Sequence, residues 1–259
     1  MQFHHTTNVV SGSAIRRRPR RRVQIALAVL VLASLLIGRA FAAGLFVTSD
    51  QITAQNLSGV SGAPTVYSWD DFNRVLNLLP GSPSPGGLIW KPQIGTWVLD
   101  SATARTTTKN KDANVLMDLS VVDASLVVTL NPVGNNARPG VTINDDGSNN
   151  MLLLYSSAGG GTLTLSTYFG PTRVFLASTG GVGAPGSSFE VRVTSNGPTI
   201  TVFVNGTLQI TQTLTGTNLC KFKDIGTGCV SDGRPNVGFG IWADADTTST
   251  FDDFRLESV

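Results

Sequence analysis

Short runs of alternating apolar and polar residues, separated by turn residues, fill the chain from Val66 onward. In residues 189–193, for example, Phe189, Val191 and Val193 alternate with Glu190 and Arg192, which is the period of a strand with one face in the core. Charged residues make up only 14% of the chain, while Val, Thr, Ile and Phe recur throughout, so long helices are not expected. The pattern predicts an all-β protein.

The clearest turn is Asn205-Gly206, because this dipeptide readily supplies the two positive φ angles of a tight hairpin. It separates expected strands at residues 199–204 and 207–213. Further strands are expected at residues 96–99, 103–108, 114–120, 125–131, 140–144, 151–155, 162–169, 172–176, 188–194, 236–242 and 250–256. The number of expected strands is larger than in an immunoglobulin domain, and it predicts a two-sheet antiparallel β-sandwich of the jelly-roll type.

The N-terminus has the pattern of an export signal. Six arginines between Arg16 and Arg22 precede an apolar stretch of 16 residues, 23–38, and Ala40-Phe41-Ala42 is a small-residue cleavage site. The alternative is an uncleaved signal anchor, although a spanning helix needs about 20 apolar residues. We expect residues 1–42 to be a signal peptide or anchor helix, residues 43–65 a tether, and residues 66–259 the β-sandwich, secreted or at the cell surface.

Charge and histidine content narrow the function of the exported part. Residues 1–42 hold seven of the 19 basic residues and no acidic one, which leaves 12 basic against 17 acidic residues. Nucleic acid and anionic lipid are therefore poor partners, and membrane contact is expected only through the N-terminal segment. The only histidines are His4 and His5, so the exported part lacks the central residue of Ser-His-Asp hydrolysis and of histidine-ligated zinc.

Cys220 and Cys229 are the only two cysteines in the chain. In an oxidising compartment, two thiols so close in sequence are expected to form one disulfide that closes a small loop.

Several segments share a pattern with a known family. They are Asp70-Asp71-Phe72-Asn73-Arg74, Gly95-Thr96-Trp97, Arg138 with Gly140-Val141, Asn149-Asn150-Met151, Val237-Gly238-Phe239-Gly240 and Phe251-Asp252-Asp253-Phe254. Together they resemble secreted concanavalin A-like lectin/glucanase domains of the laminin-G-like type, over about residues 66–259. The resemblance implies a lectin-type jelly roll whose first and last strands are neighbours. It leaves function open, because the family includes lectins, adhesion modules and glycoside hydrolases.

The resemblance also implies a possible cofactor. Neighbouring first and last strands would bring Asp70 or Asp71 close to Asp252 or Asp253. Relatives carry a structural calcium near these strands, and calcium prefers oxygen ligands, so a structural calcium ion is expected there. The alternative is that these aspartates cap turns or pair with Arg74 and Arg255.

Catalysis is not expected from the acidic residues. Glucanases of this family use two glutamates in a Glu-x-Asp-x-Glu strand, whereas Glu190 and Glu257 are the only glutamates here and stand far apart in sequence. An aspartate pair such as Asp244 and Asp246, which would share one face of a strand, remains as the enzymatic alternative.

Aromatic residues are the remaining candidates for ligand binding, since sugar rings stack on exposed aromatic side chains while polar neighbours bind the hydroxyl groups. The candidates are Trp90, Tyr155, Tyr168, Trp242, Asp244 and Asp246. Burial in the core is the alternative for each aromatic ring. The expected function is an exported, non-catalytic binding or adhesion module for carbohydrate or another cell-envelope component. A divergent glycoside-processing enzyme and a structural surface or appendage subunit without glycan binding are the alternatives.

Overall fold

The computed structural model describes residues 63–74, 79, 84–108, 112–134, 136–148, 150–157, 161–182, 186–223, 237–244 and 248–259. The chain divides into two compact units, Met1–Asn56 and Leu57–Val259, and all described residues belong to the second. The predicted export segment and the tether up to residue 62 lie outside the described residues. Among the residues that are described, no helix is both long enough and apolar enough to cross a membrane.

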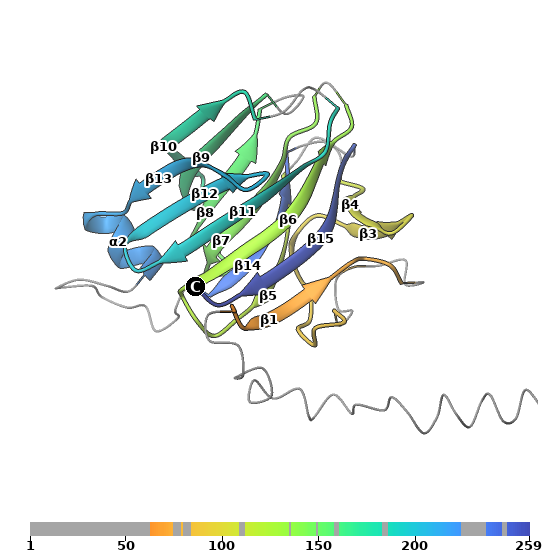
Figure 1. Ribbon diagram of the computed structural model, residues 1–259, viewed down its shortest axis with the longest axis horizontal. Helices are drawn as coiled ribbons and strands as arrows, with labels where there is room; N and C mark the ends of the chain where they lie inside the picture. The colour runs from red at the N-terminus through yellow and green to blue at the C-terminus, as the bar shows by residue number, and fades with distance from the viewer. Residues whose placement is uncertain are drawn as a thin grey trace, which may run out of the picture. The chain divides into compact units, whose positions relative to one another are not determined.

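The second unit is a sandwich of two antiparallel sheets, as the strand pattern predicted (Figure 1). The eight-stranded sheet has the order β13-β12-β11-β6-β15-β4-β3, and β1 also pairs with β15. Its strands are β1 (Val66–Asp70), β3 (Trp97–Asp100), β4 (Thr103–Thr106), β6 (Ala124–Pro132), β11 (Phe189–Asn196), β12 (Thr199–Val204), β13 (Thr207–Thr213) and β15 (Ser249–Glu257).

The seven-stranded sheet has the order β10-β9-β8-β7-β14-β5-β2. Its strands are β2 (Lys91–Ile94), β5 (Ala113–Asp118), β7 (Pro139–Asp145), β8 (Asn150–Ser156), β9 (Thr162–Phe169), β10 (Thr172–Gly180) and β14 (Gly238–Ala243). A short helix, α2 (Gly216–Lys223), follows β13.

The first and last strands are neighbours, as the family resemblance implied. β15 pairs with β6 along one edge and, along the other, with β4 and then with β1 (Figure 1). Asp70 at the end of β1 lies opposite Phe254. The register of β15 against β6 shifts between Asp252 and Arg255, and Asp253 has a φ of 51°. This bulge lies where the partner strand changes.

The core lies between the sheets and follows the alternation seen in the sequence. Phe189, Val191 and Val193 of β11 are buried there, whereas Glu190 is exposed on the outer face. The Asn205-Gly206 turn also forms as predicted, with φ angles of 46° and 76°. Burial of one face of each sheet is the main stabilising contribution in such a sandwich.

Three elements were not expected from the sequence. β2 contains Pro92, which is tolerated because β2 is the edge strand of its sheet. β1 lies before the first strand expected from the sequence, at residues 96–99. Helix α2 is held by the buried Lys223, whose Nζ donates hydrogen bonds to the Val122 carbonyl at 3.0 Å and to Asp123 at 2.5 Å.

Candidate functional site

Two aromatic rings meet on the outer face of the seven-stranded sheet. In a single cross-strand row, Trp242 of β14 lies opposite Gly140 of β7, and Gly140 lies opposite Tyr155 of β8. The ring centroids of Tyr155 and Trp242 are 5.8 Å apart. A Cβ atom on Gly140 would lie 2.9 Å from the Tyr155 Cβ, 3.1 Å from the Trp242 Cε3 and 2.6 Å from the Leu154 carbonyl oxygen. The missing side chain of Gly140 therefore lets the two rings approach each other.

Arg173 joins this aromatic pair to a second tyrosine. Its guanidinium carbon lies 5.0 Å from the centroid of the Tyr155 ring, within the range of a cation–π contact. Arg173 pairs in register with Tyr168 on β9 and also donates a hydrogen bond to its side chain. Burial raises the pKa of Tyr168, and the charge of Asp112 adds to that effect. Arg173 thus fixes both tyrosines before any ligand arrives.

A pair of carboxyl groups lies at the end of the same face. Asp112 precedes β5 and is hydrogen-bonded to Asp244, which follows β14. Burial, together with the charge and the hydrogen bond of Asp244, raises the pKa of Asp112 to about 6. Arg138 Nη1 donates to Asp244 Oδ2 at 2.7 Å. Asp112 can therefore hold a proton at mildly acidic pH, while the pair still offers oxygen acceptors.

A buried polar network supports the floor of this face. Asn114, which lies opposite Trp242, donates from Nδ2 to Asp145 Oδ2 at 2.9 Å. The hydroxyl of Thr142 is 3.3 Å from Asn114 Oδ1, to which it donates. Burial raises the pKa of Asp145 to about 6. These bonds link β5 to β7, the two strands that flank β14, beside Trp242.

Four of the predicted ligand-binding residues come together on this face: Tyr155, Tyr168, Trp242 and Asp244. Trp242 is only 2% exposed, so it forms the floor, and the two partly exposed tyrosines provide the accessible rings. Asp246 lies outside the described residues.

Trp90 is not a surface residue. It is fully buried in the core, where Nε1 donates to Asp70 Oδ2 at 2.7 Å and its ring packs against Phe72 and Phe254. A buried indole with a satisfied N–H group has a packing role, so the core alternative applies to this tryptophan.

Sequence reasoning missed Asp112, Arg173 and Phe175. Phe175 lies opposite Ser166 on edge strand β10 and is 61% exposed, on the same outer face as Arg173. The spacing of Arg173 and Phe175, two residues apart, would place both side chains on one face of a strand, and this was only a weak sign of a site. Only the register of β10 against β9 brings these residues beside Tyr155 and Tyr168.

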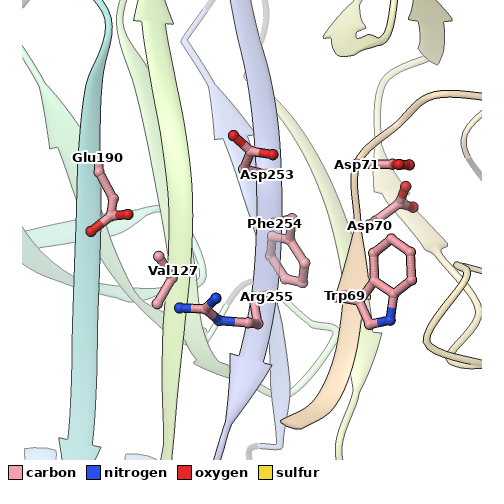
Figure 2. A pocket seen from close by; sticks show the side chains of 8 residues that line it. All are labelled: Trp69, Asp70, Asp71, Val127, Glu190, Asp253, Phe254 and Arg255. Atoms are coloured by element: carbon pink, nitrogen blue, oxygen red, sulfur yellow. The ribbon is translucent and has the colours of Figure 1, made fainter.

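The predicted calcium residues lie on the other sheet and play different roles. Asp70 is buried, and its oxygens accept hydrogen bonds from Trp90 Nε1, from the Phe72 N–H at 2.7 Å and from Arg74. Together with Asp70, Asp71 and Asp253 line a hollow of about 390 Å³ on the outer face of the eight-stranded sheet, shown in Figure 2. Asp252 precedes Asp253 in the chain. Burial raises its pKa, and the negative charges of Asp253 and Asp71 raise it further.

The structure does not test the predicted metal or disulfide. Within the described ranges, no three His, Cys, Asp or Glu side chains are grouped so that they could hold a metal ion. Calcium binding by Asp71, Asp252 and Asp253 stays a prediction, which thermal unfolding with calcium and with chelator can check. Cys220 lies in α2, but Cys229 lies outside the described residues, so their pairing also stays a prediction.

Solved structures share this fold at low sequence identity. The carbohydrate-binding module CBM66 from Bacillus subtilis matches with a TM-score of 0.53 and 13% identity, over 65% of this chain and 95% of that chain. The GH43 protein BlXynB from Bacillus licheniformis matches with a TM-score of 0.52 and 14% identity, over 74% of this chain and 39% of that chain. No protein-family model and no curated protein sequence matches this chain.

These likenesses establish the fold class. The chain has a two-sheet jelly-roll β-sandwich fold, which is consistent with the concanavalin A-like resemblance seen in its sequence.

Proposed function

We propose that this chain is an exported, non-catalytic carbohydrate-binding module whose site is the outer face of the seven-stranded sheet. One observation carries the proposal: two partly exposed tyrosines, an arginine that contacts both, and a carboxyl pair are gathered on one face of the sheet. The ligand is a glycan, and a glycan of the cell envelope fits the predicted export signal.

The chemistry of the face suits a sugar. A sugar ring presents a flat apolar side, which can lie on Tyr155 or on the exposed ring of Phe175, and a rim of hydroxyl groups. Arg138 offers donors to those hydroxyl groups, and Asp112 with Asp244 offers acceptors. Because Arg173 already holds the tyrosine rings, little conformational entropy is lost on binding.

The spacing of the carboxyl groups favours binding over hydrolysis. Asp112 and Asp244 share a hydrogen bond. The catalytic carboxyl groups of glycosidases are instead about 5–5.5 Å apart in retaining enzymes and about 6.5–9.5 Å apart in inverting ones. CBM66 is a carbohydrate-binding module, and this chain matches 95% of its length, which supports the same choice.

A glycan array tests the proposal. The full-length protein is kept in a mild detergent, because residues 23–38 are apolar. We expect at least one glycan class to bind, with affinity reduced about tenfold by Tyr155→Ala and by Phe175→Ala. Leu208→Ala is the matched control, since Leu208 is 52% exposed on β13 of the other sheet.

Two results would contradict the proposal. Absence of binding to every glycan would favour the structural-subunit alternative. Release of reducing sugar from a bound glycan would favour the enzyme alternative.

A further inference from the structure

The outer face of the eight-stranded sheet carries a groove that the proposed function does not use. We call it the Trp69 groove. The residues that line its main hollow, about 390 Å³, include Trp69, Asp71, Val127, Glu190, Asp253 and Arg255 (Figure 2). A second hollow of about 540 Å³ shares Glu190 and continues over Arg192 to Phe203. The two hollows together cross the sheet from β1 to β12.

A row of side chains across five strands forms the floor. Trp69 lies opposite Arg255, Arg255 opposite Val127, Val127 opposite Arg192 and Arg192 opposite Phe203. Trp69 is 43% exposed, so one side of its indole is available to a ligand. The groove therefore has an aromatic ring at each end and charged groups between them.

Negative charge is in excess in this groove. Arg192 and Arg255 both form ion pairs with the buried Glu257, at 2.7 Å and 3.1 Å. No ion pair between described residues involves Asp71, Glu190 or Asp253. Burial is the main cause of the raised pKa of Asp252, and the negative charges of Asp253 and Asp71 raise it further.

The three carboxylates follow a line across the sheet. Asp71 directly follows β1, which neighbours β15 and Asp253, and Glu190 lies two strands farther, on β11. Since neighbouring strands are about 4.8 Å apart, the line extends over roughly 15 Å. This arrangement matches a linear ligand that carries several positive charges.

We propose that the Trp69 groove binds an oligosaccharide with free amino groups. Its ammonium groups pair with Asp71, Asp253 and Glu190, while one sugar ring lies on the exposed indole of Trp69. Anionic glycans are repelled. The backbone of β15, β6 and β11 is hydrogen-bonded on both sides, so the floor offers no free strand edge to an extended peptide.

Titration calorimetry with a chitosan oligosaccharide tests this inference, using the full-length protein with chelator present to exclude calcium. We expect saturable binding that weakens as salt is added, and little binding of the fully N-acetylated counterpart. Trp69→Ala and Glu190→Gln should each weaken binding about tenfold. Thermal unfolding checks that both variants are folded.

The outcome is separable from that of the proposed function, because Trp69→Ala, on the opposite sheet, should weaken chitosan binding and leave the affinity for the glycan selected on the array unchanged. Equal binding of the acetylated and deacetylated oligosaccharides would overturn the inference. So would no saturable binding by the wild type, or tighter binding of an oligolysine peptide than of the amino sugar.

Discussion

The two outer faces of the sandwich differ in how their polar groups are satisfied. On the seven-stranded sheet, Arg173 contacts Tyr155 and Tyr168, and Asp112 is bonded to Asp244, so the site is built from contacts within the protein. On the eight-stranded sheet, Glu190 and the exposed indole of Trp69 face an open groove. One face is organised before binding, whereas the other keeps charge available for a ligand. Substitutions can test this difference directly.

The largest effect on stability is expected at Asp70, which is buried, whereas its neighbour in sequence, Asp71, is exposed. Asp70→Ala removes a buried carboxylate that satisfies Arg74 and Trp90 Nε1, so unfolding should become easier by about 3–5 kcal/mol. Asp71→Ala is the control, with a change of about 0.5 kcal/mol or less because Asp71 is exposed. Urea denaturation measures both. Equal losses would contradict the assignment of these two neighbours to different roles.

A pH effect of intermediate size is expected from Asp145 under the seven-stranded face. Folding raises its pKa from 3.8 to about 6, so the folded state holds more protons than the unfolded state between these values. Stability should therefore fall as the pH rises from about 4 to about 6, and this contribution should then level off. Asp145→Asn should remove about 2–3 kcal/mol of that fall. If the free energy of unfolding changes with pH in the same way for the wild type and for Asp145→Asn, Asp145 does not titrate in this way.

A smaller effect is expected at Gly140, between the rings of Tyr155 and Trp242. Gly140→Ala places a Cβ within 2.6 Å of the Leu154 carbonyl oxygen and should cost about 1–3 kcal/mol. It should also weaken glycan binding, because the two rings are forced apart. Gly180→Ala is the control, since its Cβ would meet nothing within 4 Å. Thermal unfolding and a glycan titration give the two readouts, and matching behaviour of both variants would argue against a role for Gly140.

The smallest effect is expected at the exposed ion pair between Arg138 and Asp244. Arg138 is 46% exposed, so Arg138→Gln should change the free energy of unfolding by about 1 kcal/mol or less. Its effect on glycan affinity should exceed its effect on stability if Arg138 contacts the ligand. A large loss of stability in urea, with unchanged affinity, would make this arginine a structural residue only.

The sequence predicted the sheets better than the sites. The alternation of the apolar residues Phe189, Val191 and Val193 with polar ones shows directly which face is buried. Asn205-Gly206 likewise predicts the tight turn that it forms. β1 was missed because its polar residues Ser68 and Asp70 are buried while Trp69 is exposed, the reverse of what residue type suggests. Composition and spacing therefore fixed the fold class but not every strand.

Site prediction depended on register, which local sequence does not specify. Tyr155, Tyr168 and Trp242 were chosen by residue type, and only the pairing of β7 with β8 and β14 shows that Tyr155 and Trp242 meet over Gly140. Residue type alone could not separate Trp90, which bonds to Asp70 in the core, from the exposed Trp69, which was not selected. Arg173 was missed for the same reason.

Hydroxyl-radical footprinting with the glycan that binds best on the array tests the central claim most directly. Bound glycan should protect Tyr155, Tyr168 and Phe175 from oxidation and leave Trp69 as reactive as in the free protein. Protection of Trp69 with unchanged reactivity of all three aromatic residues on the seven-stranded sheet would contradict the account.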